Sequence, residues 1–410
     1  MPTHELNKAL IAKLDEFAAA GRLKGNEAVV RAVVPPGAGR GRRYLLEGEG
    51  NKPFLRMNSN NYLGLSFRPE VIAAGEEAVR ELGAGPGAVR FISGTTAAHT
   101  DLERRLAQFH DREAAMLFSS AYAAVMGVLP PLVSDATAVL SDALNHNCII
   151  NAIALARPAE KRVYRHLDMG HLEAGLAEAR LTCTRAIIVT DGIFSMRGDH
   201  APLEEIMALA RRYDANFAEN VVVVVDDSHG VGAFGTTGRG TEEYTGSQAP
   251  DVLVATLGKA FGVNGGYVAA PETIIRYLRE TSPFYIYSNP ITPGEAAAAL
   301  EAIELVDGPL GASLLGHLRA MTQRFKAGLV ALGLETLPGE HPVVPLMLRD
   351  SARTSALVAH LRRAGILATG LNYPVVPKGE EEIRFQISAD HTEADIDDVV
   401  EALRAFGGMR

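Results

Sequence analysis

Short apolar runs alternate with amphipathic stretches through the middle of this chain. Continuous runs such as VVVVV (221–225) and VLVA (252–255) are typical of strands buried on both faces of a parallel sheet. Between the runs, apolar residues recur at helical spacing, which predicts helices over 68–83, 99–110, 171–180 and 202–214. Alternating strands and helices predict an α/β fold, with a mainly parallel sheet and helices on both of its faces.

The pattern changes from about Pro293 onward. Helical spacing dominates GEAAAALEAIELV, and it is followed by the short strands HPVVPLML and IRFQIS and a final helix, TEADIDDVVEALRAF. This predicts a smaller α+β C-terminal domain over 293–410, packed with the N-terminal segment. The large domain is expected over 56–292, and 1–55 as a helix and arm. Acidic residues interrupt the apolar positions of MPTHELNKALIAKLDEF, as in an amphipathic helix rather than a signal peptide.

Composition excludes several classes of function. The 410 residues are 47% hydrophobic, which is enough for a large core, and the net charge is −9 without a cluster of Lys and Arg. No apolar run approaches the roughly 20 residues that span a bilayer. Two cysteines, Cys148 and Cys183, make neither a disulfide framework nor a zinc cluster. We therefore expect a cytoplasmic protein with no metal site that binds neither nucleic acid nor membranes.

Five apolar runs end abruptly in small polar residues. They are AAMLFSSAY (114–122), ATAVLSDALNH (136–146), RAIIVTDGIFS (185–195), VVVVVDDSH (221–229) and VLVATLGK (252–259). In open α/β sheets, ligands bind at the carboxyl ends of the strands. We therefore expect one site that gathers serines, histidines, aspartates and a lysine.

The run VVVVVDD is the most apolar, so it predicts the central strand. A carboxylate at its end is partly desolvated and needs a fixed positive charge. Either Asp226 or Asp227 is thus expected to meet a cationic ligand atom; the alternative is a carboxylate that caps a helix or forms a turn. The following GVGAFG (230–235) matches a dinucleotide fingerprint, but no helix opens after it, so nicotinamide binding is not expected.

Lys259 ends a strand within TLGKAFGVNGGY, where Gly258 and Ala260 leave its stem unobstructed. An enclosed lysine loses its proton readily and is a candidate Schiff-base nucleophile, although a strand-end lysine could also extend to solvent or clamp a phosphate. A pyridoxal phosphate (PLP) enzyme needs such a lysine, an acid at the pyridinium nitrogen, a planar group over the ring and donors for the phosphate. The residues that supply these groups are Asp226, His146, Ser120, Ser195, His229 and Thr256.

Longer motifs point to one family. NSNNYLGL, AVRFISGT, SDALNHNCII, TDGIFSMRGD, VVDDSHGVGAFGTTGRG, TLGKAFG, YSN and YPVVPKG…IRFQISADHT are scattered over the chain. With them, the chain resembles the α-oxoamine synthases, which are fold-type-I PLP transferases, from about Leu6 to Phe406. SDALNH, DDSH, VRFISGT and YPVVPKG are most similar to the members that condense glycine with acetyl-CoA. The resemblance implies a homodimer with shared active sites.

The resemblance assigns roles to residues of this chain. It implies that Lys259 forms the Schiff base, that Asp226 holds the pyridinium nitrogen and that His146 stacks on the ring. His229 and Ser195 would hold the phenolic oxygen of the ring. The phosphate would bind Ser120, Thr256, the main chain of Ala121 and Tyr122, and, from the neighbouring subunit, Ser288 and Asn289.

Two residues are implied for the substrates: Asn60 near the acyl carbonyl and Arg384 on the amino-acid carboxylate, which suits a bidentate fork. Simpler structural roles remain open for four residues. Asn60 could cap a turn, Arg384 could pair with a glutamate on its strand, His146 could be a half-buried histidine, and Ser195 could cap a helix.

The expected reaction joins a small amino acid, glycine, to an acyl-CoA, acetyl-CoA, and releases CoA with an α-amino ketone or 2-amino-3-oxo acid. The departures from the family pattern lie near the acyl donor or the domain seam: Arg197 for an acidic residue, Phe385, Pro290 and a shorter KAFGVNGGY loop. They leave open a longer acyl chain, as in 8-amino-7-oxononanoate synthase, or a carrier-protein thioester. A PLP aminotransferase and a non-catalytic scaffold are further alternatives.

Overall fold

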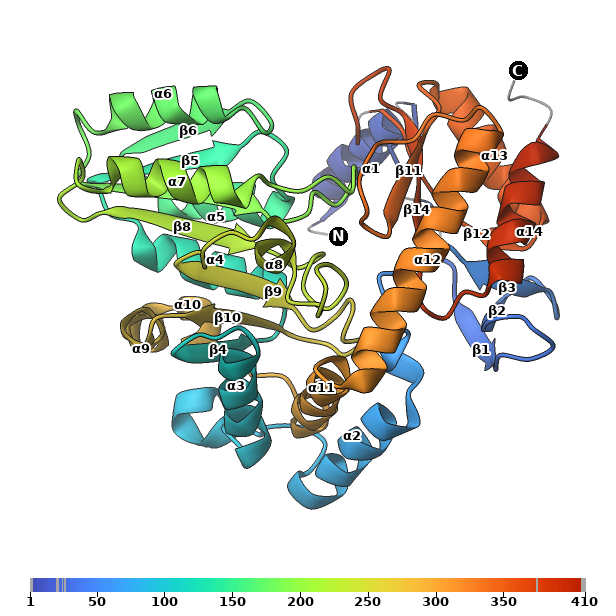
Figure 1. The fold of residues 1–410 in the computed structure, drawn as a ribbon, viewed down its shortest axis with the longest axis horizontal. Helices are drawn as coiled ribbons and strands as arrows, with labels where there is room; N and C mark the ends of the chain where they lie inside the picture. The colour runs from blue at the N-terminus through green and yellow to red at the C-terminus, as the bar shows by residue number, and fades with distance from the viewer. Residues whose placement is uncertain (1–2, 20–21, 24, 26, 374, 407–410) are drawn as a thin grey trace.

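The computed structural model describes residues 3–19, 22–23, 25, 27–373 and 375–406. A seven-stranded sheet forms the larger part of the molecule (Figure 1). Its strands, in spatial order, are β4 (Ala114–Phe118), β10 (Gly266–Ala270), β9 (Val252–Thr256), β8 (Val221–Asp226), β7 (Arg185–Asp191), β5 (Thr137–Asp142) and β6 (Glu160–Tyr164). The strand VVVVVD lies in the middle of this order, which confirms its predicted central place.

Helices cover both faces of the sheet, as the alternating pattern predicts. Successive residues of β8 face opposite sides: Val224 packs in one core cluster with α4 (Ala121–Leu132), α5 (Asn147–Ala156) and α9 (Glu272–Thr281). Its neighbours Val223 and Val225 pack in another cluster with α6 (Met169–Ala179) and α7 (Leu203–Asp214). Two further predicted helices are present as α2 (Pro69–Leu82) and α3 (Ala97–Phe109).

Two strands of this sheet, β6 and β10, were not predicted. β10 pairs antiparallel with both β4 and β9, whereas the other strand pairs of this sheet are parallel. Its sequence, GYVAA, is short and starts with glycine, so it reads as part of the loop after Lys259. The antiparallel return of β10 closes that loop, which is how the lysine is held at the sheet edge.

The C-terminal part contains the long α12 (Pro309–Ala331) and a second, antiparallel sheet. This sheet has the order β11 (Val343–Met347), β14 (Glu382–Gln386), β13 (Thr369–Leu371), and α13 (Ser351–Arg363) and α14 (Glu393–Arg404) accompany it. The preceding α11 (Pro293–Val306) lies beside α2 and α3 (Figure 1). A smaller α+β unit after the large sheet is therefore present.

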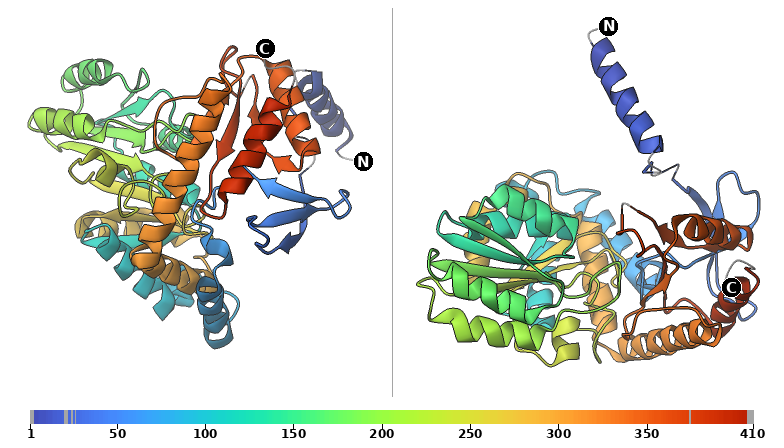
Figure 2. Two further views of the ribbon diagram at one scale, coloured as in Figure 1. Left: turned by 45° about the vertical axis from the view of Figure 1, so that its right-hand side comes forward. Right: turned by 90° about the horizontal axis from the view of Figure 1, so that it is seen from above.

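The N-terminal segment joins this smaller unit. β1 (Val30–Val34), β2 (Arg43–Leu46) and β3 (Pro53–Arg56) form an antiparallel ribbon, and β3 pairs in parallel with β12 (Ile366–Leu367). The predicted first helix, α1 (His4–Ala19), buries no residue and projects from the body of the chain (Figure 2). Its apolar positions, including Leu10 and Ile11, are therefore exposed in the single chain.

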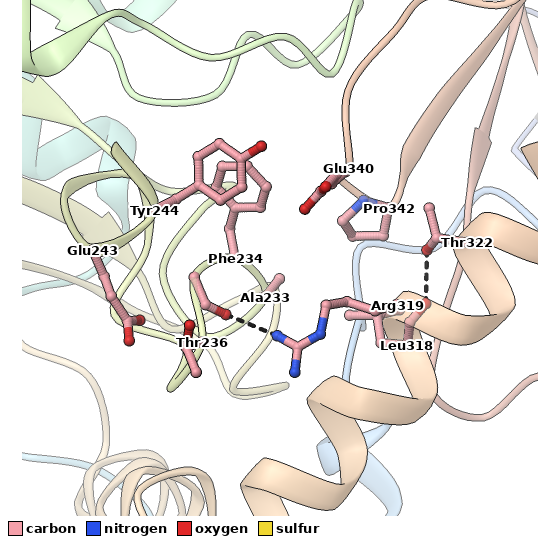
Figure 3. Close-up of a pocket in the computed structure, with 11 residues that line it drawn as sticks. Ala233, Phe234, Thr236, Glu243, Tyr244, Leu318, Arg319, Thr322, Glu340 and Pro342 are labelled. Carbon is pink, nitrogen blue, oxygen red and sulfur yellow. Dashed lines mark hydrogen bonds between the residues drawn. The ribbon is translucent and has the colours of Figure 1, made fainter. Parts of the chain in front are cut away.

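A cavity of about 380 Å³ lies between the loop after β8 and α12 (Figure 3). Arg319 reaches across it and donates a hydrogen bond to the Gly235 carbonyl, at 3.1 Å. None of the residues that line this cavity was predicted for the active site. In the described part of the chain, no helix has the length and apolar character needed to cross a membrane. Nor do the described residues include a group of three or more metal-ligating side chains placed around one point.

Candidate active site

Lys259 lies in the tight loop that connects β9 to β10. The Thr256 hydroxyl donates to the Gly265 carbonyl at 3.1 Å and accepts from the Gly258 backbone N–H at 3.0 Å. The Gly262 N–H donates to the Lys259 carbonyl at 3.0 Å, and Gly262 has a φ of 72°, which favours glycine. These bonds fix the backbone on both sides of the lysine and so set the point from which its side chain extends.

The Lys259 side chain is half-buried, and this burial lowers the pKa of its amine to about 8. Asp226 and Asp191 act in the opposite direction because their negative charges favour the protonated amine. An amine with this pKa is neutral in a substantial fraction of molecules near physiological pH. It therefore has the free electron pair that a nucleophile or base requires.

Two carboxylates lie side by side at the ends of β7 and β8, where Asp191 and Asp226 are in register. Asp226 is buried; one of its oxygens accepts from the Ser228 N–H at 3.1 Å, and the other contacts the Cys148 thiol at 3.6 Å. Burial and the charge of Asp226 raise the pKa of Asp191 well above its ordinary value. Asp191 and Cys148 were not predicted, because nothing in the sequence pairs them with Asp226.

The neighbouring Asp227 has a different task. Its carboxylate accepts from both the backbone N–H and the hydroxyl of Thr241, each at 2.6 Å. Burial raises the pKa of Asp227 to about 7. Asp227 thus holds the loop that follows β8, which is the capping and turn role considered for this pair, and Asp226 is the member that faces Lys259.

His146 is the N-cap residue of α5. Its backbone N–H donates to Asp191 at 2.8 Å, and its Nδ1 accepts from the Cys148 N–H at 3.3 Å. His146 is exposed. Partial burial lowers the pKa of His146, and Lys259 acts in the same direction. The imidazole is therefore held at its Nδ1 edge, although the residue as a whole is exposed.

A cradle for an anion forms where α4 begins. Ser120 is its N-cap, and its hydroxyl accepts from the Ala123 N–H at 3.1 Å. Gly266 of β10 lies directly beneath: a Cβ there would be 2.2 Å from the backbone nitrogen of Ala121. Because Gly266 is also in register with Thr256, the end of β9 lies close to the start of α4, where the helix dipole is positive. The structure thus gathers Ser120, Ala121, Tyr122 and Thr256.

His229 is buried at the start of a chain of hydrogen bonds. The Tyr62 hydroxyl lies 2.8 Å from His229 Nδ1 and 3.5 Å from the Asn60 side-chain oxygen. That oxygen also accepts from the Gln386 side-chain amide. The Asn60 side chain therefore belongs to a hydrogen-bonded network. The local turn is made by the Asn60 backbone carbonyl, which accepts from the Tyr62 N–H, so the side chain does not cap the turn. Tyr62 and Gln386 were missed because in NNYLGL and RFQIS they read as ordinary core and strand residues.

Arg384 crosses from the small sheet to the large one. Its Nη1 donates to the Ser195 carbonyl at 3.0 Å, while its buried Nε has no partner among the described residues. Glu382, two residues before it on β14, is 2% exposed; burial raises the pKa of this carboxyl to about 8, and Arg384 opposes the shift. Among the described residues Arg384 forms no ion pair with a glutamate of its strand, so the strand-pairing alternative for Arg384 is not what the structure shows. Ser195 contacts Arg384 through its main chain and starts no helix.

Ser288 and Asn289 are not brought to this site within the chain. They follow the short helix α10 (Pro283–Ile286), and the Ser288 hydroxyl contacts only the carbonyl of Asn289, at 3.4 Å, among the described residues. The adjacent Tyr287 is 80% exposed. Their predicted contact with the phosphate of a neighbouring subunit remains a prediction.

Comparisons with known proteins agree with this geometry. A family model described as aminotransferase class I and II matches residues 52–403. The chain is 44% identical over 357 residues to human mitochondrial 2-amino-3-ketobutyrate coenzyme A ligase, covering 87% of this chain and 83% of that protein. It is 41% identical to 8-amino-7-oxononanoate synthase of Geobacter metallireducens, with 90% and 91% covered.

Among solved structures, serine palmitoyltransferase from S. paucimobilis with a bound PLP–myriocin aldimine superposes with a TM-score of 0.86. The two are 27% identical, and the match covers 97% of this chain and 96% of that one. These likenesses extend over both sheets and the loop of Lys259. The chain therefore belongs to the aminotransferase class I and II family and, within it, to the α-oxoamine synthases, which are PLP-dependent acyltransferases.

Proposed function

We propose that this enzyme condenses glycine with acetyl-CoA to give a 2-amino-3-oxo acid and free CoA. Three curated relatives at 42–44% identity carry the name 2-amino-3-ketobutyrate coenzyme A ligase, which supports this choice of substrates. The observation that carries the chemistry is the position of Lys259: a half-buried amine with a pKa of about 8, facing the carboxylates of Asp226 and Asp191.

The residues at this site fit PLP. Two buried acids lie side by side at the ends of β7 and β8, and the charge of Asp226 contributes to the raised pKa of Asp191, so a positive charge at Asp226, such as a pyridinium nitrogen, would be stabilised there. The glycine at 266 leaves the start of α4 open to a phosphate. Asp226 would hold the ring nitrogen, His146 the ring face, and His229 with Ser195 the phenolic oxygen; the phosphate would bind Ser120, Ala121, Tyr122 and Thr256, with Ser288 and Asn289 of a second subunit.

Bound PLP supplies an electron-withdrawing ring that lets the α-carbon of an amino acid lose a proton. Lys259 Nζ takes this proton, because a pKa of about 8 leaves a substantial fraction of the amine neutral near physiological pH. Arg384 holds the substrate carboxylate with the nitrogens that have no protein partner. A bond then forms between the α-carbon and the acyl carbonyl carbon, the carbon–sulfur bond breaks, and the sulfur leaves as the CoA thiol. Asn60 would hold the acyl carbonyl, and His146 would donate a proton to its oxygen.

Borohydride trapping tests the central assignment. The protein is supplied with PLP, reduced and digested, and the labelled peptide is identified by mass spectrometry; the label is expected on Lys259. Lys259→Ala should abolish it. Lys326→Ala is the matched control. Lys326 is also half-buried, and burial also lowers its pKa, yet it lies on α12 and not in the loop after β9. A label on another lysine would refute the proposal.

A longer acyl donor is the second candidate, since 8-amino-7-oxononanoate synthases are 37–41% identical to this chain. A panel of glycine, alanine and serine against acyl-CoAs of increasing length separates the two when thiol release and product mass are measured. Fastest turnover of glycine with acetyl-CoA supports the first reading. Conversion that needs a 2-oxo acid and releases no thiol would indicate an aminotransferase, and no conversion with trapped PLP would indicate a scaffold.

A homodimer with shared sites is part of the proposal. Phe91 and Ile92 are 63% and 64% exposed, and with Tyr287 they form apolar surface that a second copy would cover. Mixing Lys259→Ala with Asn289→Ala should restore activity in mixed dimers, because one of their two sites then has both residues intact. No recovery in dimers proven by light scattering would argue against sharing. We also propose a cytoplasmic location, although the names of three relatives include "mitochondrial"; cell fractionation decides this.

A further inference from the structure

Four side chains form a continuous hydrogen-bonded path from the small sheet to His229. Gln386 on β14 donates to the side-chain oxygen of Asn60, which lies 3.5 Å from the Tyr62 hydroxyl, which in turn lies 2.8 Å from His229 Nδ1. Tyr62 and Gln386 are fully buried. His341 Nε2 lies 2.9 Å from the His229 carbonyl, so the backbone of His229 is held as well. The imidazole therefore has one fixed edge, at Nδ1.

The position of one proton on this path decides which edge of His229 can donate. Burial raises the pKa of Tyr62 above its ordinary range and lowers the pKa of His229 well below its own, so both groups are neutral. The Tyr62 proton has two acceptors, but the Asn60 oxygen already accepts the Gln386 amide and lies at the limit of hydrogen-bond distance. The short contact is the one to His229.

We infer that Tyr62 is a positioning residue that donates its hydroxyl proton to His229 Nδ1 and thereby fixes the histidine in the Nε2–H form. Nε2 makes no hydrogen bond within the described part of the chain, so its N–H is free to point into the site. Gln386 acts at the opposite end of this path, where it donates to the Asn60 side-chain oxygen. With that oxygen occupied, the Tyr62 hydroxyl donates to His229 and not to Asn60. The amide N–H groups of Asn60 then remain available to an acyl oxygen.

This inference rests on the proposed function in one respect: the free Nε2–H is the donor that the phenolic oxygen of PLP would accept. An Nδ1–H tautomer would instead direct a lone pair at that oxygen and repel it. The choice of tautomer thus decides whether His229 stabilises or opposes the bound ring, although the histidine itself never leaves its place.

The test reads the tautomer directly in the full-length protein before PLP is added. Histidine labelled with ¹⁵N gives two-bond proton–nitrogen spectra in which the two neutral tautomers differ. His229→Asn identifies the His229 signals among those of the twelve histidines. We expect the Nε2–H form in the unmodified protein and a mixture of both forms in Tyr62→Phe. After PLP is added, Tyr62→Phe should lower kcat about tenfold, shift the pH at which the absorption of the bound cofactor changes, and leave the KM for glycine within about threefold.

Tyr267→Phe is the matched control. Tyr267 is equally buried, and its hydroxyl lies 2.7 Å from His110 Nε2, so the variant removes a hydroxyl from a second buried tyrosine–histidine pair. It should change the His110 signals and leave those of His229 in place. The Nδ1–H form of His229 in the unmodified protein, or an unchanged tautomer in Tyr62→Phe, would overturn the inference. Because these spectra need no cofactor, they stand apart from the trapping experiment at Lys259.

Discussion

The two sides of the site are built differently. At the carboxyl ends of the large sheet, the two acidic side chains already have hydrogen-bond donors: Asp226 accepts from Ser228, and Asp191 accepts from His146. On β14 of the small sheet, three alternate residues each leave a buried polar atom without a partner among the described residues; these atoms are Glu382 Oε1, Arg384 Nε and Gln386 Oε1. An unpaired buried polar group costs about 1–3 kcal/mol. Under the proposed function, the large sheet is the preorganised side, which would hold the cofactor, and the small-sheet face is the side on which substrate would supply missing contacts.

The largest effect is expected at Asp226, on the preorganised side. Asp226→Ala removes the charge that would stabilise a pyridinium nitrogen, so kcat should fall about 10³-fold and PLP should be lost on dialysis. Asp227→Asn is the control. It should keep the PLP absorption band but lower the free energy of unfolding by about 1–3 kcal/mol, because Thr241 loses a charged acceptor. Equal loss of PLP in both variants would remove the distinction between the two carboxylates.

The next effect is expected at Arg384, on the substrate side. Arg384→Ala should raise the KM for the amino acid about 10²-fold, with a smaller change in kcat, because a charge-assisted pair is lost. Arg384→Lys should restore little, since an ammonium lacks the planar fork. Steady-state kinetics with Arg349→Ala as the exposed control should show unchanged constants, because Arg349 pairs only at the surface. A strong loss of PLP in Arg384→Ala would place Arg384 with the cofactor instead.

A smaller effect is expected at Gly266, because this residue contributes to the large-sheet side through a close backbone contact and not through a charge. Gly266→Ala places a Cβ 2.2 Å from the Ala121 nitrogen, so the start of α4 must move. Affinity for PLP, measured by fluorescence titration, should fall about tenfold because the phosphate cradle opens. Gly316→Ala in α12 is the matched control, since its Cβ would meet open space. Unchanged PLP affinity in Gly266→Ala would show that the cradle does not hold the phosphate.

The smallest effect concerns stability at Glu382. Burial raises the pKa of this carboxyl from 4.5 to about 8, so the folded chain keeps a proton that the unfolded chain releases. The contribution of Glu382 to stability is therefore fully present below about pH 4.5 and is lost as the pH rises toward about 8. Urea unfolding should show that Glu382→Gln abolishes this dependence and gains about 1–3 kcal/mol relative to the unmodified protein near pH 9. Glu380→Gln, at a surface position, should change the curve little; parallel curves for Glu382→Gln and the unmodified protein would contradict the assignment.

The sequence pattern predicted some strands and site residues and missed others. Apolar strands that end in polar residues predicted the central place of β8 and the gathering of Lys259, Asp226, His146 and Ser120 at one sheet edge, because parallel strands align their carboxyl ends. The pattern missed β6, whose sequence EKRVY is mostly charged, and β10, whose short glycine-led sequence carries no strand period. It also could not separate Asp226 from Asp227, since adjacent residues on a strand end differ only in the direction that the sheet gives them.

What the sequence determined by itself is the fold class, the lysine and the set of polar residues around it, because apolar periodicity and strand-end composition are local properties. Only the tertiary structure decided which side chains meet: Asp191 beside Asp226, Tyr62 on His229, and Gln386 on Asn60. These pairs join residues that are 35 to 326 positions apart in the chain. Their contacts depend on strand register and on how the two sheets face each other, and no local pattern encodes either.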